Sequence, residues 1–244
     1  MAQAEKTSAK MDPVTSRLVV AVDGPAGAGK GMVCREVSVR LGFRYLDTGS
    51  IYRAVGLISL QEGLEAPDEL ARIARGMDFQ FRSVEGIDFR AFLNGRDVSA
   101  HLREEKVGQA ASRVAALPEV REALLGFQRG YGGVENVLLD GRDVGTVVWP
   151  DAPLKIFLTA SLEERARRRA LELQGRGETV NFHDIQSRMQ ERDARDAQRA
   201  HAPLASATDS VLVDTTRLSR EESVMRVLRL VEGLIRDSAH NFKR

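Results

Sequence analysis

The sequence has few of the residues that mark disulfide-rich, metal-binding or membrane-spanning proteins. Cys34 is the single cysteine, so no disulfide framework can form, and a reducing cytoplasm is the expected location. The four histidines are scattered, and with one cysteine they make no metal-ligand pattern. No apolar run approaches the length of a membrane span, and the N-terminus shows no hydrophobic signal core. We therefore expect no protein-bound metal and no membrane partner.

Charge of one sign is not in excess either. The chain has 36 Lys and Arg residues against 35 Asp and Glu residues, so bulk binding of nucleic acid is not expected. No Ser/His/Asp or Cys/His arrangement indicates a nucleophile for covalent catalysis. The 244 residues, 43% of them hydrophobic, are enough for one α/β domain with a substantial core. Residues 1–16 are polar, and we expect them to be disordered.

One stretch near the N-terminus carries the clearest functional signal. A run of aliphatic residues that ends in a carboxylate, 18–23, predicts a buried parallel strand. It continues into a loop with Gly24, Gly27 and Gly29, then Lys30, then a helix whose apolar residues recur every fourth position. In such a phosphate-binding loop the backbone N–H groups, the helix N-terminus and the lysine all face an anion. An ordinary glycine-rich turn is the weaker alternative, because both the strand and the helix are present.

The loop departs from the general pattern at one point. That pattern places Ser or Thr directly after the lysine, where the hydroxyl serves Mg²⁺. Here Gly31 and then Met32 follow Lys30, and neither side chain has a hydroxyl.

The rest of the chain alternates between predicted strands and helices. Aliphatic runs predict strands at 42–47, 136–140, 154–158 and 210–214. Helices are expected at 48–61, 67–76, 102–116 and 183–200, after Pro118, and from capping signals at Ser161 and Ser219. This alternation is typical of a parallel sheet flanked by helices.

A different pattern interrupts this alternation. In residues 77–93 apolar and polar side chains alternate, with a turn expected at 84–86, and Asn94-Gly95 is a strong hairpin signal. The sequence therefore predicts a small antiparallel sheet set into the α/β chain.

Several arginines and carboxylates are placed where phosphates could be bound. Arg192, Asp196 and Arg199 share one helix face, with Arg188 one turn earlier. An ion-paired, solvated face is the alternative, but a phosphate-binding loop upstream favours function because phosphoryl transfer needs several cations. A second group could form a lid beside a glycine-containing hinge, or only an exposed basic helix: Arg165, Arg167, Arg168 and Arg169.

Arg142 and Asp143 directly follow a predicted core strand. They would therefore lie at the carboxyl edge of the sheet, where open α/β sheets bind ligands. Thr48 and Arg53 follow another strand and could share that edge. Asp140 either caps its strand or lies near Mg²⁺.

Together these segments resemble the bacterial cytidylate kinases, a family of nucleoside monophosphate kinases. The resemblance spans about Leu18 to Glu232 in unbroken order. The motifs that carry it are Asp23–Gly31 (DGPAGAGKG), Leu46–Arg53 (LDTGSIYR), Asp140–Val148 (DGRDVGTVV), Ile156–Leu158, Arg192–Asp196 (RDARD) and Arg199. The phosphate loop alone fits many kinases, whereas the second and third motifs together are much more specific.

The resemblance implies a single domain over residues 17–240 with a P-loop kinase core at 17–63 and 106–240. The small antiparallel sheet would belong to a monophosphate-binding insert at 64–105, and the arginine-rich segment to a lid at 162–186. The family also implies a monomer that binds ATP together with Mg²⁺.

The resemblance also assigns residues to each substrate. ATP would be bound by Gly24, Pro25, Ala26, Gly27, Ala28, Gly29, Lys30, Gly31 and Met32. The acceptor, CMP or dCMP, would be bound by Thr48, Arg53, Ser112, Arg121, Arg142, Asp143, Arg192, Asp196 and Arg199. The catalytic cations would be Lys30, Arg142, Arg169 and Arg192.

The expected function is phosphorylation of CMP and dCMP by ATP through direct in-line transfer. A UMP kinase is a weaker interpretation, because a carbonyl of uracil would face Asp143 unfavourably. A second alternative is a non-catalytic or weakly active nucleotide-binding homologue, because Met32 stands where the family usually has Thr.

Overall fold

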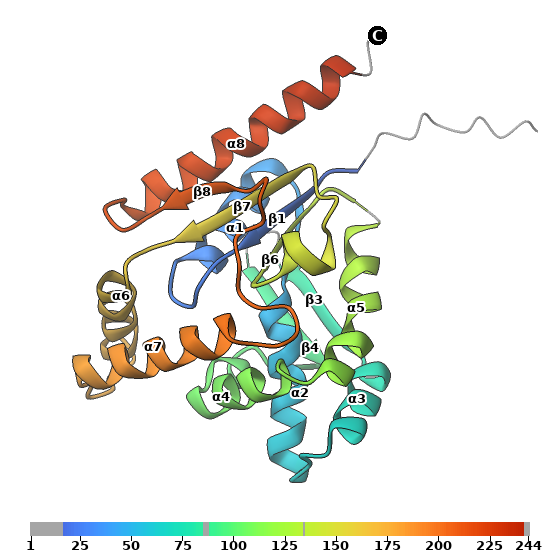
Figure 1. Ribbon diagram of the computed structural model, residues 1–244, viewed down its shortest axis with the longest axis vertical. Coiled ribbons are helices and arrows are strands. Elements are labelled where there is room, and N and C mark those ends of the chain that lie inside the picture. Colours follow the sequence, from blue (N-terminus) through green and yellow to red (C-terminus); the bar gives the residue numbers. More distant parts are fainter. Residues whose placement is uncertain (1–16, 85–87, 134, 242–244) are drawn as a thin grey trace, which may run out of the picture.

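A computed structural model describes residues 17–84, 88–133 and 135–241 of the chain (Figure 1). The expectation for residues 1–16 lies outside this part, as does most of the turn expected at 84–86. The described residues contain no helix that is long and apolar enough to cross a membrane.

The centre of the molecule is a parallel five-stranded sheet in the order β2-β6-β1-β7-β8. Its strands are β1 (Val19–Asp23), β2 (Arg44–Asp47), β6 (Val137–Gly141), β7 (Leu154–Thr159) and β8 (Val211–Asp214). All five residues of β1 and of β6 are buried, which explains their continuous aliphatic sequences. The five predicted strands are therefore confirmed as one parallel sheet, and the helices that flank it complete the predicted α/β fold.

The helices alternate with these strands along the chain. They are α1 (Lys30–Leu41), α2 (Thr48–Glu62), α3 (Pro67–Gly76), α4 (Glu105–Val114), α5 (Pro118–Gly132), α6 (Leu162–Gln174), α7 (Phe182–Ala197) and α8 (Arg220–Asn241). Helix α1 packs beside α8 and against β6, while α2 packs along α4 and α3 along α5. In Figure 1 the end of α8 extends beyond the sheet.

A second, antiparallel sheet lies in the predicted insert. It consists of β3 (Phe79–Val84), β4 (Asp88–Leu93) and β5 (Arg96–Asp97) in sequential order. The alternating side chains Phe79, Phe81, Phe89, Ala91 and Leu93 are all buried, which is the pattern that the sequence predicts. Asn94 and Gly95 both have positive φ at the hairpin turn, as the tight two-residue turn requires.

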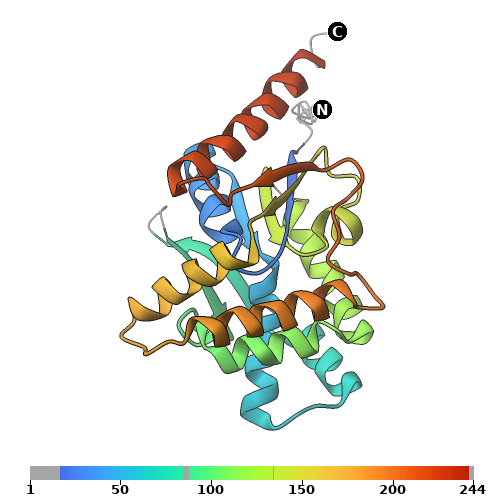
Figure 2. The ribbon, with the colours of Figure 1, turned by 60° about the vertical axis from the view of Figure 1, so that its left-hand side comes forward.

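Helices α6 and α7 pack against each other as a hairpin (Figure 2). They enclose a small apolar cluster of their own, formed by Ala166, Ala170, Ile185 and Met189, which is separate from the main core.

Two helix predictions are wrong at their ends. The helix expected at 102–116 is broken at Glu104, which is extended between a short 3-10 turn (His101–Arg103) and α4. The Leu102 carbonyl instead accepts a hydrogen bond from Arg53 Nη1 at 2.6 Å. Helix α7 ends at Ala197 rather than at 200, because the Leu204 N–H returns to the Asp196 carbonyl at 2.8 Å.

The close packing of α2 on α4 depends on Gly56. A Cβ atom at Gly56 would lie 2.9 Å from the Ala111 nitrogen, so we expect Gly56→Ala to destabilise the fold by roughly 1–3 kcal/mol. A Cβ at Gly126 in α5 meets nothing within 4 Å, so Gly126→Ala should stabilise the fold by up to about 1 kcal/mol. Urea unfolding of both variants tests this, and equal effects would contradict the close helix contact.

Candidate active site

A cavity of about 1450 Å³ opens at the carboxyl ends of β1, β2 and β6. It is lined by the glycine-rich loop, by residues that follow β2 and β6, and by side chains from α4, α6, α7 and the start of α8. All predicted site residues except Gly24 and Pro25 line it: Ala26, Gly27, Ala28, Gly29, Lys30, Gly31, Met32, Thr48, Arg53, Ser112, Arg121, Arg142, Asp143, Arg169, Arg192, Asp196 and Arg199. Residues from far-separated segments therefore meet in one place.

The glycine-rich loop needs its glycines for two reasons. Gly24, Gly27 and Gly29 have φ values of +147°, +76° and +94°, a region that other residues rarely adopt. A Cβ at Gly24 would also lie 2.0 Å from the Leu158 carbonyl oxygen of β7. The loop therefore lies directly against the sheet, and α1 begins at Lys30.

Lys30 is buried at the base of the loop. Its Nζ donates to the carbonyls of Gly24 at 2.9 Å and Pro25 at 3.0 Å, and lies 3.9 Å from Asp140 Oδ1. Burial, together with the positive charge of Arg142, lowers the pKa of Lys30 to about 8, and Asp140 opposes this shift. Burial likewise raises the pKa of Asp140 to about 6 against the attraction of Lys30. The attraction within the pair thus offsets only part of the cost of burial.

Asp196 of α7 is 1% exposed and joins two arginines. It accepts from Arg142 Nε at 3.1 Å and forms an ion pair with Arg199. Burial alone would raise its pKa, but Arg142, Arg199 and Arg192 outweigh burial and hold the pKa below its usual value. Arg199 lies beyond the end of α7 rather than on its face, yet it still meets Asp196.

Asp143 is paired in a second cluster. It follows β6 and forms an ion pair with Arg121 of α5. Burial raises the pKa of Asp143, and the charges of Arg121 and Arg199 only partly oppose it. Asp143 and Asp196 therefore present two buried carboxyl groups to one cavity, each beside arginine.

Two polar atoms at this end of the cavity have no partner among the described residues. They are Arg192 Nε and Ser112 Oγ, and both atoms are buried. Burial and the charges of Arg142 and Arg53 lower the pKa of Arg192 to about 10. Buried polar groups normally have hydrogen-bond partners, so these two atoms are available to a polar ligand.

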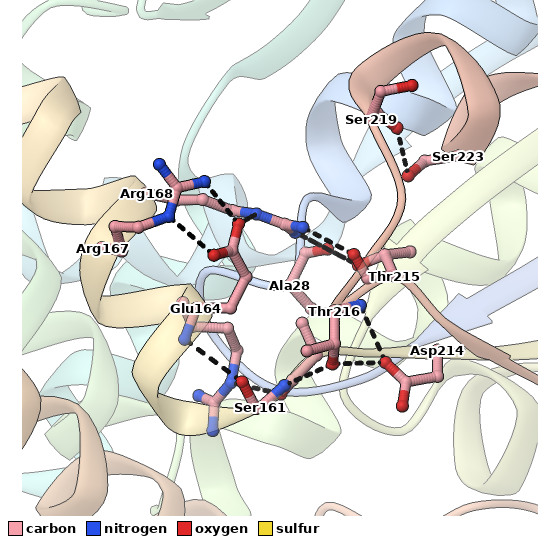
Figure 3. Close-up of polar contacts among 12 residues, drawn as sticks. Ala28, Ser161, Glu164, Arg167, Arg168, Asp214, Thr215, Thr216, Ser219 and Ser223 are labelled. Carbon is pink, nitrogen blue, oxygen red and sulfur yellow. Dashed lines mark hydrogen bonds and ion pairs between the residues drawn. The ribbon is translucent and has the colours of Figure 1, made fainter.

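The four α6 arginines have different partners, so they do not act as a single group. Figure 3 shows two of them, Arg167 and Arg168, beside Glu164. Arg168 donates to the Ala28 carbonyl at 3.3 Å and to the Thr215 carbonyl at 2.7 Å. Arg165 donates to the Ala26 carbonyl at 3.0 Å. These two arginines therefore connect α6 to the phosphate-binding loop.

The other two arginines pair within or beside α6. Arg167 is exposed and pairs with Glu164, whereas Arg169 pairs with Glu172 at 2.8 Å and with Glu105 of α4 at 3.1 Å. Of the four, Arg167, Arg168 and Arg169 line the cavity.

Sequence reasoning missed the supporting residues. The Thr215 hydroxyl accepts a hydrogen bond from Arg168 and donates one to the Ala28 carbonyl at 3.2 Å. A threonine after a strand has no sequence pattern that would predict these contacts. Asp23, to which the sequence analysis gave no role of its own, accepts from the N–H groups of Val144 at 2.8 Å and Gly145 at 2.7 Å. It thereby fixes the turn that follows Asp143.

The buried Asp23 gives a pH prediction for stability. Burial raises its pKa from 3.8 to about 6, so its protonated form favours the folded chain. This contribution is complete below the unfolded pKa and is lost as the pH rises through about 6. We expect the unfolding free energy of the unmodified chain, minus that of Asp23→Asn, to fall by roughly 1–2 kcal/mol between pH ~4.5 and ~7.5. Urea unfolding at both pH values measures it, and a constant or rising difference would contradict the assignment.

Comparison with known proteins shows which family the chain belongs to. The family model described as "Cytidylate kinase" matches residues 20–233. The cytidylate kinase of Magnetococcus marinus is 58% identical over 91% of this chain and 99% of its own length. Those of Vibrio vulnificus (strain YJ016) and Edwardsiella ictaluri are 49% and 48% identical, over 88% and 86% of this chain and 96% and 94% of their own lengths. The chain belongs to the cytidylate kinase family.

Proposed function

We propose that this chain transfers the γ-phosphoryl group of ATP to CMP and dCMP, which yields CDP and dCDP. The observation that carries the proposal is a single cavity in which a phosphate-binding loop faces a cluster of arginines and two buried carboxyl groups. The relatives named above are cytidylate kinases, and the chain matches them over nearly their whole length.

The acceptor would bind at the end of the cavity away from the loop. Arg53, Arg121, Arg142 and Arg192 are the cations for its phosphate, and Asp196 is the acceptor for the sugar hydroxyls. The base would be contacted by Thr48, Ser112, Arg121, Asp143 and Arg199. A carboxylate accepts a hydrogen bond from the amine of cytosine, whereas uracil presents a carbonyl there. This difference supports cytosine over uracil.

The donor would bind at the glycine-rich loop, residues 24–32, with its phosphates against the loop backbone and the N-terminus of α1. Phosphoryl transfer spreads negative charge over the phosphoryl oxygens, so it depends on cations held in position. Lys30, Arg142, Arg169 and Arg192 are the cations that we assign to this charge. No covalent intermediate is needed.

Magnesium would arrive with ATP and would neutralise charge on its phosphates. The described residues contain no cluster of three or more His, Cys, Asp or Glu that could hold a metal, and neither Gly31 nor Met32 has a hydroxyl. These residues fit an ion that is coordinated by the phosphates of ATP and by water. The loop backbone would bind the phosphates, and so hold the ion only indirectly.

The division into core, insert at 64–105 and lid at 162–186 is part of the proposal. Its support is that the small sheet is separate from the main sheet and that α6 and α7 have their own apolar cluster. A hairpin with its own core can move as a unit over the phosphates and exclude water. The monomeric state and the cytoplasmic location stay predictions.

A coupled assay for ADP formation tests the proposed function. With ATP and Mg²⁺, we expect kcat/KM for CMP or dCMP to exceed that for UMP and for AMP by at least about tenfold, or ~1.4 kcal/mol. Preference for another monophosphate would contradict the base contacts. Nucleotide binding without any turnover would favour the non-catalytic alternative, for which Met32 is the sole support.

Met32 gives a prediction about rate. Its thioether can neither donate nor strongly accept a hydrogen bond near the donor phosphates. We expect Met32→Thr to raise kcat by about 2- to 10-fold, because the threonine hydroxyl can add one hydrogen bond near the donor phosphates. Met32→Val is the matched control, since valine has the shape of threonine without the hydroxyl. Steady-state kinetics of both variants measure this effect. Equal kcat values for Met32→Thr and Met32→Val would show that the hydroxyl does not contribute to the rate.

A further inference from the structure

Tyr45 lies behind the cavity, and no role assigned above uses it. It is the second residue of β2 and is only 1% exposed. A buried tyrosine hydroxyl needs a hydrogen-bond partner, and that of Tyr45 donates to Asp140 Oδ2 at 3.1 Å. Burial and the charge of Asp140 raise the pKa of Tyr45 well above its usual value, so the hydroxyl remains a donor at neutral pH.

The ring of Tyr45 is held in place by the small sheet. Phe81 and Phe89 contact it edge-on, with ring centroids 5.5 Å and 5.1 Å away. The guanidinium of Arg35 lies over it, 5.9 Å from the centroid. Packed on these sides, the ring is held in one place, so the position of its hydroxyl oxygen is fixed.

The two carboxylate oxygens of Asp140 have different neighbours, Tyr45 and Lys30. One carboxylate oxygen accepts from the Tyr45 hydroxyl, and the other lies 3.9 Å from Lys30 Nζ. A Cβ at Gly31 would lie 3.5 Å from both the Tyr45 hydroxyl and Asp140 Oδ2. The hydroxyl and carboxylate therefore lie directly behind the first turn of α1, where Lys30 begins the helix.

Lys30 needs this carboxylate. Burial and Arg142 both disfavour its positive charge, and Asp140 is the strongest influence in the opposite direction. A carboxylate that rotated away from Lys30 would leave a buried cation beside Arg142 with less compensation.

We propose that Tyr45 is a positioning residue for phosphoryl transfer, which orients the Asp140 carboxylate so that it keeps Lys30 charged and in place. This inference rests on the proposed function, because it gives Tyr45 its effect through the cation assigned to the transferring phosphoryl group. Tyr45 itself touches neither substrate. The phenylalanine pair that holds its ring also makes the small sheet part of this support.

Tyr45→Phe tests the proposal because it keeps the ring and removes only the hydroxyl. We expect kcat to fall by about 5- to 20-fold, on the order of one hydrogen bond to a charged group. The KM for the monophosphate should change by less than about twofold, because the residues assigned to the acceptor are untouched. An unchanged kcat would overturn the proposal.

Tyr131→Phe is the matched control. The Tyr131 hydroxyl donates to the Phe81 carbonyl, so its loss also removes one hydrogen bond from the small sheet, but away from Asp140. We expect its kcat to stay within about twofold of the unmodified chain, with a thermal midpoint lowered about as much as in Tyr45→Phe. Equal losses of kcat in the two variants would reduce Tyr45 to a structural role and overturn the proposal.

Two further measurements keep the outcome unambiguous. In an Asp140→Asn background, the additional Tyr45→Phe change should alter kcat by less than about twofold, because its route through the carboxylate is already lost. A full additional loss there would contradict the proposal. The rates are measured with whichever monophosphate the unmodified chain uses best, so a best substrate other than CMP or dCMP would contradict the proposed function alone. Absence of turnover with every monophosphate would overturn both.

Discussion

The site depends on burying charged side chains at the carboxyl edge of a parallel sheet. An isolated buried charge is costly, so each must lie near an opposite one. Lys30 faces Asp140, Arg142 and Arg199 meet Asp196, and Arg121 meets Asp143. Apart from Arg199 and Asp196, which are three residues apart, the partners come from different segments, so these pairs require the sheet, α5 and α7 to be assembled together. The same charges that need each other in the folded chain are those suited to phosphates and a polar base.

The phosphate-binding loop is stabilised from both sides. Inside, Gly24 lies against β7, and Lys30 returns to the loop carbonyls. From α6, Arg165 donates to the Ala26 carbonyl. Arg168 of the same helix donates to the Ala28 carbonyl (Figure 3). Helix α6 also belongs to the hairpin with its own apolar cluster. A movement of this hairpin would therefore act directly on the glycine-rich loop. If the hairpin is the lid proposed above, its closure would be linked to the geometry of the bound phosphates.

The elements that the sequence predicts well are those with strong local signals. The β1 strand, the loop glycines and the Asn94-Gly95 hairpin follow from side-chain burial and backbone conformations that nearby residues decide. The predictions that are wrong lie where distant contacts intervene. Arg53 donates a hydrogen bond to the Leu102 carbonyl beside the break at Glu104. At the end of α7, the Asp196 carbonyl accepts one from the Leu204 N–H. Neither contact leaves a trace in the local sequence pattern.

The sequence by itself determined the parallel sheet, the phosphate-binding loop and the family. Aliphatic runs, loop glycines and motif spacing are patterns of short sequence segments, so they can be recognised without the fold. Only the tertiary structure decided how the charged residues divide among roles. Arg168 and Arg169 are adjacent in the chain, yet one holds Thr215 and the loop while the other faces Glu105. Tyr45 looks like an ordinary strand residue until β2 pairs with β6 and brings its hydroxyl to Asp140. Such partners are set by three-dimensional packing, because a buried charge is stabilised by whichever group lies nearest in space.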